Sequence, residues 1–314
     1  MDQFFIVLTQ IGVFLTLIVI GILVMKWGVL DENGLVTVSK LVMKIALPAY
    51  IFINTVEGAT RAGLRQSLMM IPLTAVMYLL LLGLSWVLER VFRLQGNRKK
   101  VFRAISMFGN VGFMGIPLVV ELYPDTALLY IALFTILDQG LFWTYGVTLT
   151  QPVSAQKQKF SLKGLKKLLS PALVAILVGT VMVLLGLHLP GVLTTALSKL
   201  GSASMPLSLI YIGGMLSLTD VRKVLRCGEL YAEIGLKMLV LPLVYFTVMT
   251  LLKVPADMAG TVTFLTALPS INMVAMLAKN NGSDGEYAVC AVMMTTIACL
   301  VTLPLVSLGI ALIG

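Results

Sequence analysis

The chain has 314 residues, of which 59% are hydrophobic and only 12% are charged, and its mean hydropathy is +1.00. A water-soluble domain has about 25% charged and about 45–50% apolar residues. Because too few polar side chains are present to cover a soluble globule, we expect an integral membrane protein. The net charge of +9 then reflects orientation in the bilayer, since basic loops stay cytoplasmic. We expect lipid as a partner and no nucleic acid.

The residue types needed for most enzyme sites are scarce. A single histidine, His188, excludes most zinc sites and His-dependent triads by count alone. The cysteines Cys227, Cys290 and Cys299 lack metal-ligand spacing and do not suggest a disulfide framework. No GxSxG, Walker-type or HExxH arrangement occurs in the sequence. We therefore expect a protein that is not an enzyme and that uses neither a metal nor a cofactor.

Taken in chain order, the apolar segments predict ten transmembrane helices, each of the length that crosses a bilayer core about 30 Å thick. The first opens with Asp2 and lacks the basic start of a signal peptide, so we expect it to be retained. Nine or eleven spans are the alternatives if one short segment is re-entrant. The expected spans are residues 4–28, 34–56, 64–89, 99–121, 123–149, 169–187, 192–217, 228–252, 257–279 and 285–313.

The distribution of basic residues agrees with this arrangement. With the spans placed as above, 17 of the 23 Lys and Arg residues fall on one side of the membrane. They concentrate after the third span, in the segment 151–168 and after the seventh span. Because that side should be cytoplasmic, we expect both termini to be extracytoplasmic in a cell membrane, either plasma or bacterial inner membrane.

The basic cytoplasmic linker 151–168 divides the chain into two five-helix repeats, residues 1–150 and 169–314. Because each half has an odd number of spans, the second repeat is inverted relative to the first. Prolines occur in corresponding spans of the two halves. Interrupted spans at matching places are the best sequence indication of a midplane transport site. The alternative is that they are ordinary kinks. The pairs are Pro48 with Pro206, Pro72 with Pro242, and Pro117 with Pro269.

The fourth and ninth spans carry the strongest local signals. In the fourth, Gly109, Asn110 and Gly112 precede Pro117, so a continuous helix is not expected. In the ninth, Pro269 is followed by Ser270 and Asn272. If the two broken helices cross, the N-terminal ends of two half-helices would direct partial positive charge at a bound anion. The alternative is that the glycines only permit close helix packing. The predicted substrate-binding residues are Gly109, Asn110, Gly112, Pro117, Pro269, Ser270 and Asn272.

Three segments carry a resemblance to a known family: 46–49 (ALPA), 109–118 (GNVGFMGIPL) and 267–278 (ALPSINMVAMLA). They resemble the auxin efflux carrier family, in its prokaryotic form with a short central loop. The resemblance implies a scaffold domain, a transport domain of crossed broken helices like that of sodium/bile-acid symporters, an organic anion substrate and often a homodimer. The third span lacks the acidic-basic pair of the plant carriers, so proton coupling, sodium coupling and uniport all stay open.

Four of the charged residues within the expected spans bear on function or helix packing. Asp138 would take up a proton during transport or would only lock helices together by hydrogen bonds. Lys44 would attract an anion or pair with Asp138, or else extend toward the headgroups. Glu233 and Lys237 have the spacing of a helical ion pair, for which we expect structural neutralisation.

Together these features predict an all-α polytopic membrane protein with crossing fourth and ninth helices. We expect a secondary active transporter that moves a small monocarboxylate or dicarboxylate by alternating access of an elevator type. The alternatives are a passive anion channel and a membrane receptor that binds its ligand without moving it.

Overall fold

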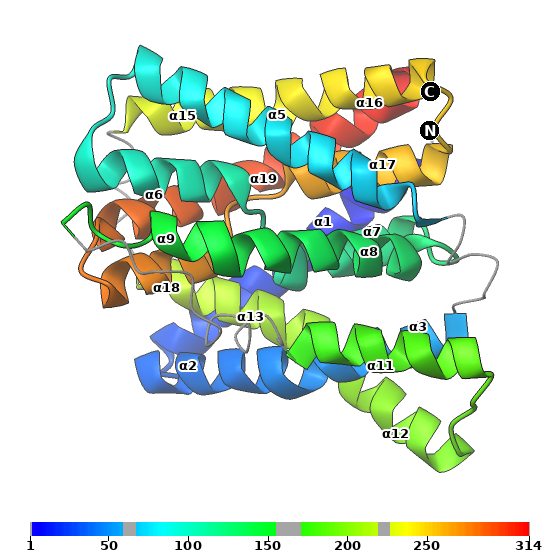
Figure 1. Ribbon diagram of the computed structural model, residues 1–314. Coiled ribbons are helices and arrows are strands. Elements are labelled where there is room, and N and C mark those ends of the chain that lie inside the picture. The colour runs from blue at the N-terminus through cyan, green and yellow to red at the C-terminus, as the bar shows by residue number, and fades with distance from the viewer. Residues whose placement is uncertain (1, 59–66, 155–170, 219–226, 314) are drawn as a thin grey trace.

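The computed structural model describes residues 2–58, 67–154, 171–218 and 227–313 (Figure 1). Most of the expected linker 151–168 therefore lies outside the described residues. Within the described ranges the secondary structure is helical, apart from one isolated β-bridge between Gly109 and Ser270.

In the first half, the structure begins with α1 (Asp2–Lys26). Helix α2 (Glu32–Leu41) continues through the π-helical turn η1 (Val42–Ala46) into α3 (Leu47–Gly58). They are followed by α5 (Met70–Val91), α6 (Gly96–Met107), η2 (Val111–Gly115) with α7 (Ile116–Leu122), and α8 (Ala127–Leu141) with η3 (Phe142–Gly146) and α9 (Val147–Leu149).

The second half of the chain contains the remaining helices. They are α11 (Pro171–Leu185), α12 (Gly191–Ser202), α13 (Ser204–Ser217), α15 (Gly228–Gly235) with η4 (Leu236–Val240) and α16 (Leu241–Leu251), α17 (Ala256–Ala267), α18 (Asn272–Asn280) and α19 (Gly285–Ile313).

Six helical stretches in the described ranges are long and apolar enough to cross a membrane. The prediction of an all-helical, multi-pass membrane protein is thus confirmed, while the count of ten spans and the inverted repeat stay predictions. The apolar helices Gly12–Lys26 and Val111–Leu122 are shorter. The six stretches are Glu32–Glu57, Met70–Val91, Ala127–Leu149, Gly191–Ser217, Gly228–Leu251 and Gly285–Ile313.

Three of the π-helical turns directly precede a proline in the same span: Pro48, Pro117 and Pro242. A proline within a helix lacks an N–H and its ring clashes with the carbonyl four residues earlier. In each case the N–H of the residue before the proline donates to the carbonyl five residues earlier. This bond widens the turn and relieves the clash. The spans therefore continue through these prolines with a local deformation.

The helices form two groups (Figure 1). The first group consists of α1, α2, α3, α11, α12 and α13, in which α1 packs along α13 and α3 packs against α11 and α12. The second group consists of α5 to α9 and α15 to α19, in which α5 packs on α6 and α8, and α16 packs on α17. The groups meet where α1 touches α7 and α19 and where α13 touches η2.

The perimeter of the bundle is apolar. Leu79, Val192 and Leu251 are 67%, 82% and 77% exposed. Large apolar side chains in such numbers on an outer surface are costly in water and expected in lipid. The hydrophobic core lies between the helices, where polar residues are also buried.

Candidate functional site: the crossing of two broken helices

The breaks in the two interrupted helices lie against each other. One break, residues 108–110, separates α6 from η2, and the other, residues 268–271, separates α17 from α18. The Asn110 N–H donates to the Pro269 carbonyl at 2.7 Å, and the Ile271 N–H donates to the Phe108 carbonyl at 3.0 Å. The structure thus brings both predicted breaks to one place, and each break satisfies backbone groups that the other leaves free.

Small residues allow this close approach. A Cβ atom on Gly109 would lie 3.1 Å from the Cβ of Leu268, and one on Gly115 would lie 2.6 Å from the Cδ1 of Leu268. Pro269 has no N–H to return to the helix, so α17 ends before it. The glycine spacing of the fourth span therefore serves packing of the two breaks, in addition to interrupting the helix.

Ser270 is fixed by its surroundings. Its hydroxyl donates to the Ile105 carbonyl of α6 at 2.9 Å, and its N–H donates to the Thr295 hydroxyl of α19 at 3.1 Å. The residue is fully buried. These bonds indicate that Ser270 holds the second break in position against α6 and α19.

The buried side chain of Asn110 makes fewer hydrogen bonds than its amide group allows. Its side chain is 1% exposed, and its Oδ1 accepts a long hydrogen bond from the Phe113 N–H at 3.4 Å. Its Nδ2 has no hydrogen-bond partner in the described part of the chain. Leaving a buried polar group unpaired costs about 1–3 kcal/mol. The amide is therefore a donor that an acceptor on a ligand would satisfy.

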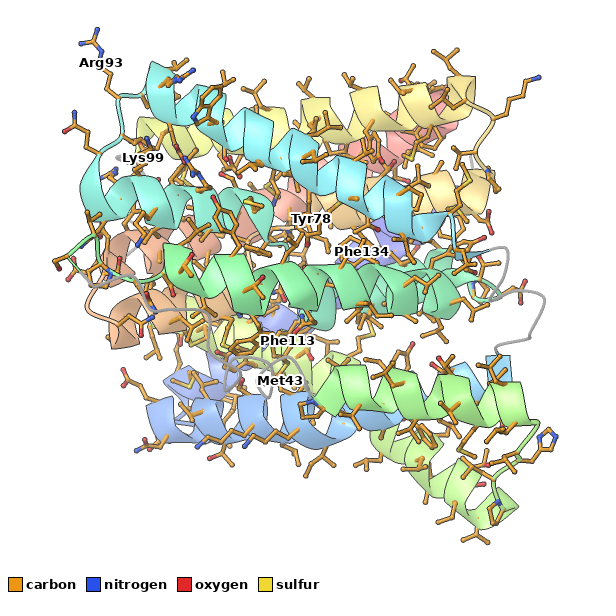
Figure 2. The ribbon with its side chains drawn as sticks, in the orientation of Figure 1. Met43, Tyr78, Arg93, Lys99, Phe113 and Phe134 are labelled. Carbon is orange, nitrogen blue, oxygen red and sulfur yellow. The ribbon has the colours of Figure 1, made fainter. Side chains whose placement is uncertain are left out.

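The crossing lies at the boundary between the two groups of helices. The Phe113 ring stacks on the Tyr211 ring of α13, with centroids 5.5 Å apart. A Cβ atom on Gly112 would lie 3.4 Å from the Cδ2 of Leu47 and 4.0 Å from the sulfur of Met43. Figure 2 shows Phe113 and Met43 near each other at this boundary. Pro117 and Asn272 are half-buried, in α7 and at the start of α18.

A buried lysine also reaches the crossing. Lys237, in η4, is 0% exposed, and its Nζ donates to the carbonyl of Leu268 at 2.6 Å. Glu233, one turn earlier, is also 0% exposed and accepts from the Ser106 hydroxyl of α6 at 2.8 Å. The spacing of the two residues suggested mutual neutralisation. The two charges interact electrostatically, but no direct ion pair between them occurs within the described ranges.

The π-helical turn η4 gives a physical reason for this difference. It begins at Leu236, between the two charged residues, and a wider turn changes the angular offset that an ordinary helix gives to positions four apart. Sequence reasoning missed the contact of Lys237 with the crossing. The available signal was a lysine in an apolar span five residues before Pro242.

Asp138 lies to one side of the crossing, where its carboxylate accepts two hydrogen bonds. Its carboxylate accepts from the Tyr78 hydroxyl at 2.5 Å and from the Gln139 amide at 2.9 Å. The Tyr78 ring packs on Phe108, with centroids 5.8 Å apart, so Asp138 reaches the first break through Tyr78. Figure 2 shows Tyr78 and Phe134 within the second group.

Lys44, in η1, has an exposed side chain, and it forms no ion pair with Asp138 in the described part of the chain. The structure thus brings Lys44 to the outside of a span and Asp138 to the inside. No group of three or more His, Cys, Asp or Glu side chains that could hold a metal ion occurs among the described residues.

The fold and the interrupted, polar centre define a multi-pass helical membrane protein of the transporter class. The profile of the family described as membrane transport protein matches residues 6–307, and the chain belongs to this family. The resemblance to the auxin efflux carriers is confirmed, and the family consists of transporters, not enzymes.

Two archaeal relatives cover nearly the whole chain. An uncharacterized transporter from Methanothermobacter thermautotrophicus is 25% identical over 292 residues, which cover 93% of this chain and 94% of the relative. A second uncharacterized transporter, from Methanocaldococcus jannaschii, is 24% identical over 300 residues, with 93% and 94% covered. This chain is therefore similar to these proteins over nearly the whole length of both partners in each comparison.

Proposed function

We propose that the protein is a secondary active transporter that moves a small organic anion, a monocarboxylate or a dicarboxylate, across the cell membrane. The observation that carries this proposal is the crossing, where the buried Asn110 Nδ2 has no partner among the described residues and lies between two paired helix breaks. The helices η2–α7 and α18 begin at the breaks, and helix N-termini carry partial positive charge. Such a centre suits a carboxylate.

The proposed mechanism is alternating access of an elevator type. The second group of helices carries the crossing and would move against the first group, which would stay fixed as a scaffold. The contact between Phe113 and Tyr211 spans the boundary between the groups and would be broken and remade in each cycle. In this proposal the chain has ten spans in two inverted repeats, and the homodimer stays an expectation.

The proposed function predicts that Asn110→Ala weakens transport at low concentrations of the acid. We expect the wild-type protein in proteoliposomes to take up one acid saturably from a panel of malate, malonate, succinate, lactate and indole-3-acetate. The variant should lose about 10- to 100-fold in the apparent affinity for that acid, because a hydrogen bond to a charged group is lost. Radiolabelled uptake over a range of acid concentrations measures both the affinity and the maximal rate.

Asn281→Ala is the matched control. Its amide lies beyond the end of α18 that is remote from the second break and donates to the Thr150 hydroxyl at 3.2 Å, so transport should be unchanged. Uptake that rises linearly with concentration would favour a channel. Saturable binding of an acid without accumulation would favour a receptor. If Asn110→Ala transports as well as wild type, the crossing is not the substrate site.

The proposed topology predicts opposite accessibility for two exposed turns. Arg93, between α5 and α6, should face the cytoplasm, and Lys253, between α16 and α17, should face outward. Single cysteines at these positions, in a background lacking Cys227, Cys290 and Cys299, would be labelled with a membrane-impermeant maleimide on intact cells. We expect Lys253→Cys to react on intact cells and Arg93→Cys only after permeabilisation. Labelling of both on intact cells would contradict the inverted arrangement.

A further inference from the structure

Two buried, oppositely charged side chains on one span form hydrogen bonds at or beside different helix breaks. Lys237 donates to the carbonyl of Leu268 in the second break, whereas Glu233 accepts from Ser106, which lies two residues before the first break. Both side chains are fully buried. The span formed by α15, η4 and α16 thus contacts both broken helices with charged groups.

Each of these groups has unused hydrogen-bonding capacity. The Oε1 atom of Glu233 has no partner in the described part of the chain. An ammonium group can donate three hydrogen bonds, and the described residues accept one from Lys237. The Asn110 Nδ2 at the same crossing also lacks an acceptor there. Two kinds of donor therefore converge on the breaks, and a carboxylate could accept from both.

Charge balance limits what can bind here. A buried, uncompensated charge is strongly unfavourable in a membrane protein interior. Glu233 and Lys237 together are neutral, so an added anion would leave one net negative charge. A proton on Glu233 removes that excess, because the site then contains one ammonium group and one bound carboxylate. Binding of the anion and of the proton should therefore favour each other.

The neighbouring ionisable groups do not supply this compensation. Helix α19 contributes Cys299, which faces Lys237. Glu229, at the start of α15, is paired with Arg98 of α6, beside which Tyr287 of α19 also lies. Glu89 of α5 is paired with Arg103 of α6, and Tyr245 of α16 donates to the Leu73 carbonyl. Within α17 the one charged residue is Asp257. It lies in the first turn of the helix, and its carboxylate accepts a hydrogen bond from the Tyr130 hydroxyl.

We propose that Lys237 binds the carboxylate of the transported anion at the crossing and that Glu233 takes up the proton that accompanies it. This inference rests on the proposed function. In each inward step, one carboxylate group and one proton enter together, and both leave on the other side, so no covalent bond changes. The Leu268 carbonyl and the substrate share the ammonium group, so substrate binding is coupled directly to the position of the second break.

The test measures proton movement driven by the substrate. Proteoliposomes in sodium-free buffer contain a pH-sensitive dye, and the acid that the wild-type protein transports is added outside. We expect wild type to acidify the lumen on addition of the acid, and an inward proton gradient to accelerate uptake. Glu233→Gln should still exchange labelled acid for unlabelled acid but should lose both the acidification and the stimulation by the gradient. Glu286→Gln, an exposed glutamate on α19, is the matched control and should behave as wild type.

Lysine variants test the other half of the inference. Lys237→Met should raise the apparent KM for the acid about 10- to 100-fold, because a charged hydrogen-bond donor is lost. Lys237→Arg keeps the charge and should restore part of the affinity. It therefore keeps the test informative if Lys237→Met does not fold. A loss of maximal rate in both variants, with the KM unchanged, would mean that Lys237 only positions the break and would overturn the inference.

The failures of the two proposals can be told apart. If wild type moves no carboxylate, the proposed function fails and this inference fails with it. If wild type moves an acid but Glu233→Gln still carries protons, or if Asp138→Asn abolishes the proton flux and Glu233→Gln does not, only this inference is overturned. A requirement for sodium in place of a proton gradient would also overturn it.

Discussion

Replacement of Gly213 by alanine is expected to destabilise the protein markedly. Gly213, in α13, faces α1 so closely that an added Cβ atom would lie 2.0 Å from the carbonyl oxygen of Ile18. Gly21, in α1, makes the reciprocal approach, with a Cβ position 2.2 Å from the carbonyl oxygen of Ile210. Both obstacles are backbone atoms, so a flexible side chain cannot move aside and the helices must separate.

Overpacking of this kind costs typically about 1–3 kcal/mol and occasionally more, and we expect Gly213→Ala to lie at the upper end. The loss would appear as a lower melting temperature in detergent and a smaller folded fraction after purification. Gly83→Ala is the matched control, because no atom of another described segment lies within 4 Å of its Cβ position in α5. That substitution should be neutral or slightly stabilising, since alanine favours a helix over glycine. Equal melting temperatures for both variants would contradict the close contact of α1 with α13.

Removal of Arg103 is expected to have a comparable or larger effect in the second group of helices. Arg103 of α6 donates to both carboxylate oxygens of Glu89, at 2.8 Å from its Nε, and to the Tyr145 hydroxyl at 3.1 Å. The Glu89 side chain is 1% exposed. Removing one partner of a buried pair costs about 3–5 kcal/mol, because the other charge is left buried without compensation.

Arg103→Met should therefore lower the melting temperature strongly, and Glu89→Gln added to it should recover most of the loss by removing the orphaned charge. Lys99→Met is the control. Lys99 also faces Glu89, at 3.8 Å, but its side chain is 42% exposed, and an exposed pair contributes about 0–1 kcal/mol. Figure 2 shows Lys99 near the start of α6. If Arg103→Met and Lys99→Met have equal effects, the burial of the Glu89 pair does not govern its contribution.

Local chemistry explains which parts of this architecture can be predicted from the sequence. The membrane-embedded, helical character follows from composition, and the interruptions at Gly109 and Pro269 follow from residues that cannot continue a helix. The pairing of the two breaks was expected from their matching positions in the two halves. The hydrogen bond from the Asn110 N–H to the Pro269 carbonyl was not, because it depends on tertiary packing that no local pattern encodes.

The side chains of the site were less predictable, because partners are set by packing between distant segments. Ser270 stays a predicted substrate-binding residue, although its hydroxyl and its N–H already donate to Ile105 and Thr295. Lys237 was expected to neutralise Glu233; the two charges do interact electrostatically, but the hydrogen bond of Lys237 goes to the Leu268 carbonyl. A pattern of charges four residues apart assumes a regular helix, and the proline at 242 removes that regularity. The deformation was foreseeable from Pro242, but the direction in which it turned Lys237 was not.

The pairing of the two breaks also bears on how the chain is made. The N–H of Asn110 and the carbonyl of Phe108 find their partners in a segment synthesised much later, around Pro269. Until that segment enters the bilayer, the first half holds open backbone groups that hydrocarbon cannot solvate. The nascent first half is therefore an unfinished intermediate that must be shielded by the insertion machinery or by water. A ribosome stalled between the halves would leave a fragment that quality-control proteases can recognise by its exposed, unpaired peptide groups.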